Sequence, residues 1–408
     1  MNFVFVSPQF PTNYWAFCAR LRELGVDVYG IGDAPYDSLD PRLRKALGEY
    51  FRVDDGTDYE QAYRAMAYLA WKHGRPAWVE SNNEFWLETD ARLRTDFHVT
   101  TGVDEQGVVP FKSKSAQKAL YAKAAVPTAE ARPVRERGDI ARAVEELGLP
   151  LIAKPDVGVG AAGTRKLASK TAVRRFEREW QGEPYLLERF VHADAILSYD
   201  TIFDSHAEPL FESSFCFPPS IMDVAQKGLD LAYHVCPVSP KLARMGRAMA
   251  KEFGARQRFV HFEFFRLASD QPGLGEKGSI VGLEANMRPA GGISPDMMSW
   301  AHGCDVYRVW AEMVAFDERR DAEPDAGLCC AYAARRDGHA YAHTADEVLV
   351  RFADNMRLHE RVPDALADDL GNEAFVALFD DERQARRFTR YVQRRQPKTT
   401  ARPDAKEA

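Results

Sequence analysis

Short apolar runs alternate with segments of helical spacing over the first quarter of the chain. Segments 14–24 and 59–73 carry apolar residues three and four positions apart, which is typical of helices with one buried face. The apolar runs lie at residues 3–6, 26–31, 50–53 and 77–80. Strands separated by helices of this length predict a small parallel sheet. The loop after the first run contains Pro8 and Pro11 in place of a GxGxxG motif, which argues against a dinucleotide-binding dehydrogenase.

The pattern changes after about residue 105. A helix is predicted for residues 114–124, just before Val126 and Pro127, and a charged helix for residues 381–393. Further apolar runs predict strands at residues 149–155, 185–188, 259–265, 278–281 and 328–334. We therefore expect a mixed fold, α/β and α+β, in four parts. These parts are an N-terminal domain at residues 1–105, a central body at 106–310, a small C-terminal cap at 311–395 and a flexible tail at 396–408.

Composition narrows the class of protein. The 408 residues are 45% hydrophobic and 28% charged, which is enough for two or three globular domains. The net charge of −7 lacks the basic excess of a general nucleic-acid binder. There is no apolar run of 18 residues, the start has no basic signal-peptide region, and the six cysteines are scattered. We therefore expect a cytoplasmic protein with free thiols and no membrane or nucleic-acid partner.

The strongest candidate for chemistry follows the apolar run at 278–281. Glu284, Asn286 and Arg288 alternate there with apolar residues, so on a strand their side chains would share one face. Carboxylate and amide oxygens suit Mg²⁺, which usually also holds substrate phosphates, and a guanidinium can bind a phosphate or a carboxylate. The simpler alternative is that Asn286 is a turn residue and Arg288 makes a surface ion pair.

A second acidic candidate is Glu263, which lies between Phe262 and Phe264. A carboxylate in so apolar a strand needs a metal or a partner such as arginine. Its strand and the strand of Glu284 are consecutive, and we expect them to pair as a hairpin. Two carboxylates and an amide would then hold one or two Mg²⁺ ions. His261 would share the face of Glu263, either as a packed core residue or as a further site group.

Two lysines are candidates for phosphate binding. Lys154 ends an apolar run and precedes a loop whose backbone N–H groups can approach phosphate oxygens. The glycines of this loop are Gly158, Gly160 and Gly163. The alternative is a tight surface turn, and the loop is not a P-loop because the lysine precedes it. Lys114 opens a predicted helix and would reach phosphates, unless it is a solvated charge; Lys112 is its nearby competitor.

The end of the run at 185–188 is a candidate for holding a purine. Glu188 or the carbonyl of Arg189 would accept from the amino group, and the N–H of Val191 would donate to a ring nitrogen. Asp194 would take a ribose hydroxyl. An ordinary strand end is the simpler interpretation of each of these residues.

In this order and spacing, the residues resemble the ATP-grasp superfamily over roughly residues 1–310. The resemblance implies a parallel-sheet pre-ATP-grasp domain, then a two-lobed ATP-grasp domain that binds ATP and Mg²⁺, with Mn²⁺ as an alternative. It implies roles for the candidates as follows: phosphate binding by Lys114, Lys154 and the loop of Gly158, Gly160 and Gly163; adenine binding by Glu188, Arg189 and Val191; Mg²⁺ binding by Glu263, Glu284 and Asn286; catalysis by Arg288 and Lys154.

Two features depart from the superfamily pattern. The acid that usually holds the ribose is not at a clear position: Asp194 is near, while Ala195 and Ile196 occupy the alternatives. The loop between the two metal strands is also longer than in many members.

The resemblance implies a carboxylate–amine ligase, similar to amino-acid ligases, biotin carboxylases and purine-pathway ligases. A carboxylate would attack the γ-phosphate to give ADP and an acyl phosphate, and an amine would displace the phosphate to form an amide or peptide bond. The expected partners are a small carboxylate and an amine, and a homodimer is compatible with the architecture. Specificity is expected in the loops, such as residues 213–239, and in the cap. Three alternatives stay open: a biotin-carboxylase-like enzyme that activates bicarbonate, a small-molecule kinase and a non-catalytic nucleotide-binding module.

Overall fold

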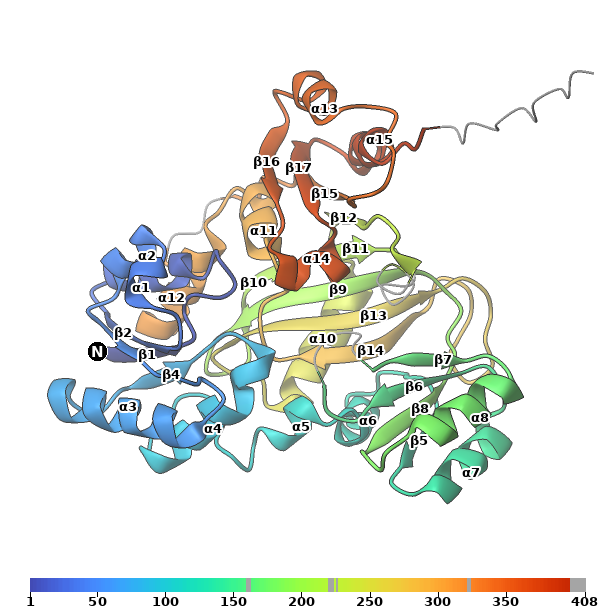
Figure 1. The fold of residues 1–408 in the computed structure, drawn as a ribbon, viewed down its shortest axis with the longest axis horizontal. Helices are drawn as coiled ribbons and strands as arrows, with labels where there is room; N and C mark the ends of the chain where they lie inside the picture. Colours follow the sequence, from blue (N-terminus) through green and yellow to red (C-terminus); the bar gives the residue numbers. More distant parts are fainter. Residues whose placement is uncertain (159–162, 219–223, 225–226, 321–323, 397–408) are drawn as a thin grey trace, which may run out of the picture.

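The computed structural model describes residues 1–158, 163–218, 224, 227–320 and 324–396, which Figure 1 shows as a ribbon. The N-terminal strands pair in parallel, in the order β3-β2-β1-β4. They are β1 (Asn2–Val6), β2 (Asp27–Gly32), β3 (Glu49–Arg52) and β4 (Trp78–Glu80). The helices around this N-terminal sheet are α1 (Trp15–Glu23), α2 (Pro41–Ala46), α3 (Tyr59–His73) and α4 (Leu87–Asp96). The predicted parallel sheet is therefore confirmed.

Both faces of the N-terminal sheet are covered by helices, and alternate residues of β1 point to opposite faces. Phe3 and Phe5 pack with residues of α1, whereas Val4 and Val6 pack with residues of α3. Because both faces of the strand are covered, successive residues are all apolar, as residues 3–6 are in the sequence.

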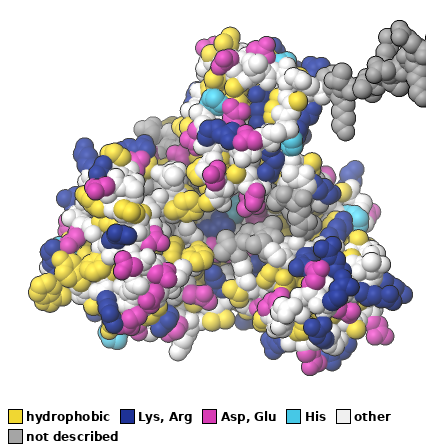
Figure 2. Space-filling model, viewed as in Figure 1, with side chains coloured by type: hydrophobic (Ala, Val, Ile, Leu, Met, Phe, Trp, Pro, Cys, Tyr) yellow, Lys and Arg dark blue, Asp and Glu magenta, His cyan; other side chains and the backbone are white. Residues whose placement is uncertain are grey.

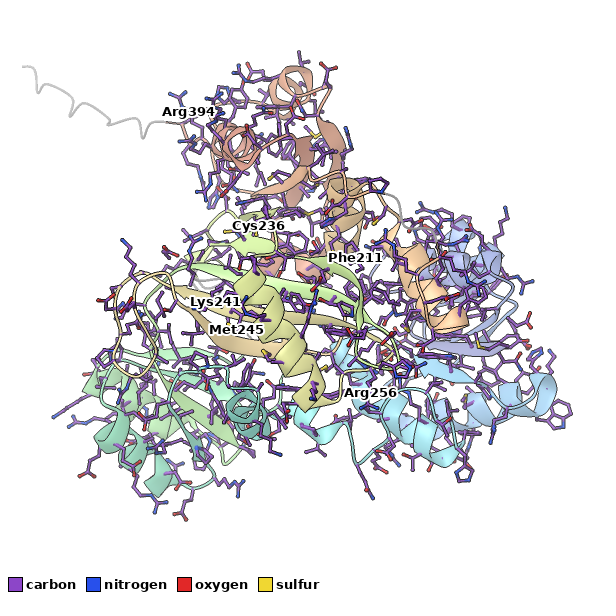
Figure 3. All side chains as sticks on the ribbon, turned by 180° about the vertical axis from the view of Figure 1, so that it is seen from behind. Phe211, Cys236, Lys241, Met245, Arg256 and Arg394 are labelled. Carbon is purple, nitrogen blue, oxygen red and sulfur yellow. The ribbon has the colours of Figure 1, made fainter. Side chains whose placement is uncertain are left out.

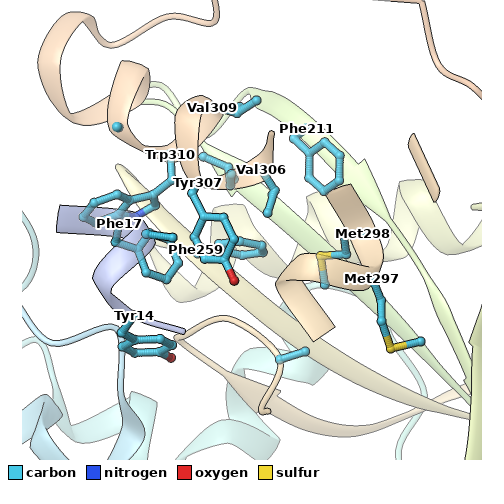
Figure 4. Packing of buried hydrophobic residues seen from close by; sticks show 14 of the residues in the cluster. Tyr14, Phe17, Phe211, Phe259, Met297, Met298, Val306, Tyr307, Val309 and Trp310 are labelled. Atoms are coloured by element: carbon cyan, nitrogen blue, oxygen red, sulfur yellow. The ribbon is translucent and has the colours of Figure 1, made fainter. Parts of the chain in front are cut away.

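A distant helix completes one of these faces. In Figure 4, Tyr307 and Trp310 of α12 (Val306–Phe316) lie against Phe17 of α1. Their ring centroids lie 4.8 Å and 4.9 Å from that of Phe17, in edge-to-face arrangements that aromatic pairs favour. The chain thus returns to its N-terminal domain near residue 310, and the division that we propose there falls inside α12.

A small antiparallel sheet forms a separate lobe. Its strands pair in the order β5-β8-β6-β7. They are β5 (Ala131–Val134), β6 (Leu151–Pro155), β7 (Arg165–Leu167) and β8 (Tyr185–Arg189), with α7 (Arg137–Leu147) and α8 (Lys170–Glu179) on one face. Leu151 and Ala153 pack toward the helices, so Ile152 and Lys154 face the other way. Lysine and arginine side chains gather on the outside of this lobe in Figure 2.

A large sheet joins the centre of the molecule to its C-terminal part. Its strands pair in the order β14-β13-β9-β11-β12-β15-β17-β16, with β10 beside β9. They are β9 (Ala193–Phe203), β10 (Pro209–Ser213), β11 (Phe215–Phe217), β12 (Ala232–Val235), β13 (Arg258–Leu267), β14 (Ile280–Asn286), β15 (Cys329–Arg335), β16 (Met356–Arg361) and β17 (Glu373–Phe379). Because β12 and β15 are hydrogen-bonded neighbours, the sheet is continuous into the proposed cap.

Helices cover this large sheet. They are α5 (Val109–Lys112), α6 (Lys114–Lys123), α10 (Pro240–Phe253), α11 (Ser294–His302), α13 (Ala345–Arg351), α14 (Asp364–Leu370) and α15 (Glu382–Val392). Seen from behind in Figure 3, α10, with Lys241 and Met245 labelled, crosses the strands. Gly246 permits this close approach, because a Cβ there would lie 2.1 Å from the ring of Tyr199. Among the described residues, no helix combines the length and apolar character needed to cross a membrane.

A buried ion cluster joins the N-terminal domain to the large sheet. Arg94 and Arg258 each donate to the Glu80 carboxylate through Nη2, over 2.9 Å and 2.8 Å. Nearby, Asp90 accepts a 2.6 Å hydrogen bond from the Ser81 hydroxyl. Burial, reinforced by the Glu80 charge, raises the pKa of Asp90 to about 8. The folded state therefore favours the protonated form of Asp90, and Glu80 is the carboxylate that both arginines share.

Candidate active site

A cavity of about 650 Å³ lies between the large sheet, the small sheet and the segment after β14. This volume is within the usual range for small-molecule sites. Its lining includes most of the candidates chosen from the sequence: Lys114, Lys154, Glu188, Arg189, Val191, Glu263, Glu284, Asn286 and Arg288. The fold thus brings together residues that the sequence places as much as 174 positions apart, from Lys114 to Arg288.

The predicted hairpin is confirmed. β13 and β14 pair in antiparallel register, with Glu263 opposite Glu284 and His261 opposite Asn286. The register shifts between Glu263 and Phe264, next to the acidic pair. Directly opposite residues on one face lie close together, so the two carboxylates and the amide form one group at the cavity wall.

Each lysine candidate is paired with a carboxylate of the cavity. The Lys114 Nζ lies 2.9 Å from Oε1 of Glu284, and the Lys154 Nζ lies 2.7 Å from Oε2 of Glu188. Glu188 also receives Lys118, whose Nζ lies 2.5 Å from Oε1. Lys118 is not among the candidates chosen from the sequence, although its place four residues after Lys114 puts both lysines on one helix face.

Opposing charges set the ionisation of these carboxylates. Burial acts to raise the pKa of Glu188, but Lys154 and Lys118 outweigh it and bring that pKa down to about 2. Burial raises the pKa of Glu284. Lys114 acts to lower this pKa, but the negative charges of Glu263 and Glu84 act with burial, so the net shift is upward. Glu284 and Glu263 therefore form a site where a further cation would be favourable.

The acidic group has the chemistry of a partial Mg²⁺ site. Among the described residues, no group of three or more His, Cys, Asp and Glu side chains is arranged to hold a metal. Two carboxylates and one amide oxygen, from Glu263, Glu284 and Asn286, nevertheless fit Mg²⁺, which is usually held by one or two carboxylates and completed by substrate phosphates and water.

Arg288 meets the N-terminal domain at this cavity. Its Nη2 and Nε lie 3.1 Å and 3.3 Å from Oε2 of Glu84, which belongs to a short 3₁₀ helix, Glu84–Trp86. Glu84 is not among the candidates chosen from the sequence, because nothing local in residues 84–86 indicates a partner about two hundred positions away. Lys112, the competitor of Lys114, is buried and donates to the Glu84 carbonyl over 2.9 Å, so it supports this contact.

His261 belongs to the cavity wall as well as to the core. Its Nδ1 lies 2.7 Å from Oδ1 of Asp200, and its Nε2 lies 3.6 Å from Oε1 of Glu263. Burial acts to lower the pKa of His261, but the Asp200 carboxylate outweighs burial, and the pKa rises to about 9. Asp200 in turn accepts a hydrogen bond from the Ser198 hydroxyl, so the carboxylate that holds the His261 imidazole is itself held in place.

The remaining candidates lie around the small-sheet end of the cavity. The Lys114 Nζ donates to the Gly158 carbonyl over 3.4 Å, and Gly163 adopts a positive φ of 72° beside Pro155. Gly160 lies outside the described residues. Asp194 is exposed and accepts a 2.6 Å hydrogen bond from Arg266, so its expected contact with a ribose stays a prediction.

Comparisons of the sequence and of the structure with known proteins identify the fold. The sequence matches no protein-family model, and no curated protein matches it. The structure is similar to phosphoribosylglycinamide synthetase from Anaerococcus prevotii (TM-score 0.65, 11% identity, 95% of this chain and 96% of that one). It is similar to an L-amino acid ligase from Bacillus licheniformis (TM-score 0.70, 14% identity, 96% of each chain).

A third similar structure was solved with nucleotide. It is the biotin carboxylase domain of 2-oxoglutarate carboxylase from Hydrogenobacter thermophilus, in complex with MgADP, ADP and bicarbonate. The TM-score is 0.66 at 16% identity, over 94% of this chain and 87% of that one. These similarities extend over nearly the whole chain, and the protein has the ATP-grasp fold.

Proposed function

We propose that the protein is an ATP-dependent carboxylate–amine ligase that forms an amide or peptide bond and releases ADP and phosphate. One observation carries this proposal: in an ATP-grasp fold, Lys114, Lys154 and Arg288 line the same cavity as Glu263 and Glu284. Phosphoryl transfer depends mainly on positioning and on neutralising charge, and this set of residues supplies both. The similar structures, which include a synthetase, a ligase and a carboxylase domain, support the same class of reaction.

In this proposal, the small-sheet end of the cavity binds ATP. Lys114, Lys154 and the loop of Gly158, Gly160 and Gly163 bind the phosphates. Glu188 is expected from the sequence to accept from the adenine amino group, but both of its carboxylate oxygens already meet lysines, so in this proposal it fixes Lys154 and Lys118 instead. The chain from Arg189 to Val191 faces the adenine, and Asp194 is the candidate for the ribose. When bound by Glu263, Glu284 and Asn286, Mg²⁺ would neutralise charge on the β- and γ-phosphates.

The proposed reaction has two steps. A substrate carboxylate oxygen bonds to the γ-phosphorus as the bond from that phosphorus to the ADP oxygen breaks, which gives an acyl phosphate. The amine nitrogen then bonds to the acyl carbon, loses a proton and expels inorganic phosphate. Arg288 stabilises the negative charge of the transferring phosphoryl group and of the acyl phosphate through N–H groups other than those that meet Glu84, since a guanidinium carries five donors.

Product analysis tests this proposal. ADP and free phosphate are measured after incubation with Mg·ATP and a panel of acids and amines, singly and in pairs, with Glu284→Gln as the inactive control. ADP and phosphate released together, and only when acid and amine are both present, are expected. ADP without free phosphate would indicate a kinase. Turnover with bicarbonate as the acid would indicate a carboxylase-like enzyme, and nucleotide binding without turnover on any pair would contradict the ligase proposal.

A further inference from the structure

The cavity has a second end, which is lined by apolar and aromatic residues. We call it the aromatic end and define it by Phe217, Leu231, Tyr233, Leu366 and Leu370. The rings of Phe217 on β11 and Tyr233 on β12 are stacked, with centroids 4.8 Å apart and planes 24° apart. Tyr233 stacks in turn on Tyr332 of β15, at 4.9 Å. These three rings form a stacked row across neighbouring strands of the large sheet, in which both faces of Tyr233 and one face of Phe217 are covered by another ring. We call the part of this row that lines the cavity, Phe217 and Tyr233, the floor.

This floor begins beside the acidic group. The Phe217 ring centroid lies 6.3 Å from that of His261, whose Nε2 is 3.6 Å from the Glu263 carboxylate. In the strand order, β11 and β12 lie on the side of β13 that is away from β14. A molecule with its carboxylate at Arg288 would thus extend past the acidic group, with its body beside Phe217.

The C-terminal part of the chain also lines the aromatic end. Leu366 and Leu370 of α14 line the aromatic end, and the Tyr332 hydroxyl holds α14 by donating to the Leu370 carbonyl over 2.8 Å. A Cβ added at Gly292 would lie 2.9 Å from Cδ1 of Leu370, so the glycine segment after β14 closely approaches this helix. Apolar side chains of α14 therefore line the same end of the cavity as Phe217.

Positive charge is concentrated away from the aromatic end. Among the described residues that line the cavity, the lysines and arginines are Lys114, Lys154, Lys166, Arg189 and Arg288. The first four come from α6 and the small sheet, and Arg288 follows β14, which lies on the far side of β13 from β11 and β12. His261 has carboxylates at both ring nitrogens, and α14 contributes the acidic Asp369. A phosphate or second carboxylate of a substrate would meet acidic or apolar groups at this end.

We infer that the aromatic end binds the body of an unphosphorylated acid with an aromatic or large apolar side chain. Its carboxylate points to Arg288 and the nucleotide. This inference rests on the proposed function, and it gives that function a substrate class. Burial of apolar surface favours such a substrate, and so does contact with the half-buried ring of Phe217. The same surface disfavours a sugar phosphate, since the phosphate would lose water without gaining a cation.

A matched pair of acids tests the inference. Binding of 3-phenylpropanoate and of 3-phosphonopropanoate is measured by calorimetry on the full chain with Mg²⁺ and a non-hydrolysable ATP analogue. The phenyl acid should bind at least about tenfold more tightly, because a phenyl group buried on an aromatic floor contributes more than one decade of affinity. Equal or tighter binding of the phosphonate, or no binding of the phenyl acid, would overturn the inference.

Variants locate the acid on the floor. Phe217→Ala should weaken 3-phenylpropanoate about tenfold and leave nucleotide affinity within about twofold, and Phe217→Leu should lie between it and the wild type. Phe217 is only half-buried, so both variants should fold. Trp71→Ala, at a side chain 81% exposed on α3, is the matched control and should change neither affinity. Unchanged affinity for the phenyl acid in Phe217→Ala would overturn the inference.

The inference and the proposed function can fail separately. If aromatic acids bind in a Phe217-dependent way but no amine leads to ADP release, the ligase proposal is contradicted and the aromatic acid site is supported. If ADP and phosphate are released only with phosphorylated or small polar acids, the ligase proposal is supported and the inference of an aromatic acid substrate is contradicted.

Discussion

Arg288 and Glu84 meet across the cavity, with the arginine Nη2 3.1 Å from the glutamate Oε2. The arginine follows β14 of the large sheet, and the glutamate belongs to the N-terminal domain. Both side chains are largely buried, so their charges balance each other where water screens them little. The N-terminal domain thus holds the arginine that we propose acts on the phosphoryl group.

Replacing Arg288 should reduce turnover far more than nucleotide binding. Arg288→Lys keeps the charge but loses the two-donor geometry, so we expect kcat/KM to fall by about 100-fold or more. Glu84→Gln should give a smaller loss, mainly in kcat, because Arg288 remains but is less well positioned. ADP release and nucleotide affinity are measured in parallel, with exposed Arg256→Lys as the control. Full activity of Arg288→Lys would refute the catalytic role.

Glu284→Gln should separate activity from stability. The variant should lose Mg²⁺-dependent turnover, because one carboxylate of the proposed metal site is gone. Without metal, its melting temperature should match or exceed that of the wild type, because burial and the nearby Glu263 raise the pKa of Glu284 and thus disfavour its charge. Exposed Glu276→Gln, on the same hairpin, is the control. A large drop in melting temperature would mean that Glu284 is mainly structural.

Lys154→Ala should weaken ATP binding. A charge-assisted contact to phosphate contributes about 1.5–3 kcal/mol, so we expect affinity to fall by at least about tenfold. Lys118 still pairs with Glu188 in this variant, which limits the damage to the fold. Calorimetric titration with Mg·ATP checks the effect, and Lys170→Ala on the exposed start of α8 is the control. Unchanged ATP affinity would show that Lys154 does not bind phosphate.

Asp90 should make the protein less stable at alkaline pH. Its pKa is raised to about 8 from an ordinary value of 3.8, by burial and then by Glu80. The folded state thus favours the protonated acid, and the stability that it gives is complete below the ordinary pKa and lost as the pH rises through about 8. Between these limits, the free energy of unfolding should fall by up to about 1.4 kcal/mol per pH unit from this group.

Asp90→Asn provides the check on this pH dependence. The amide mimics the neutral acid, so unfolding in urea should show a shallower pH dependence between pH 5 and about pH 8 than in the wild type. Exposed Asp37→Asn should keep the wild-type slope. If Asp90→Asn also keeps it, Asp90 is ionised in the folded protein.

Local patterns in the sequence were sufficient to predict the N-terminal sheet and the hairpin. The apolar run at residues 3–6 is β1, and the alternation around Glu284 belongs to a strand that pairs with β13. These features depend on spacing within a few residues or on consecutive strands. The sequence therefore also indicated that Glu263 and Glu284 would lie close together.

Contacts between distant segments could not be predicted in this way. The pairing of β12 with β15 joins strands about a hundred residues apart, and no periodicity records it. Glu84 has its partner at Arg288, and the floor of Phe217 and Tyr233 depends on the order of strands in the sheet. Residues 213–239 were expected to matter for specificity, but their apolar character alone does not distinguish a core from a substrate surface.

The shared carboxylate of Glu80 also affects how this chain can be recombined with others. Arg258 of the large sheet has its charge balanced by a residue of the N-terminal domain, at 2.8 Å and out of contact with water. In a chimera that takes its first hundred residues from another protein, the Arg258 guanidinium would be buried without a counter-charge unless that protein supplied an acid at the same place. An uncompensated buried charge costs about 3–5 kcal/mol of stability. A single side chain can therefore limit the exchange of whole domains, and Glu80 and Arg258 would have to be exchanged together.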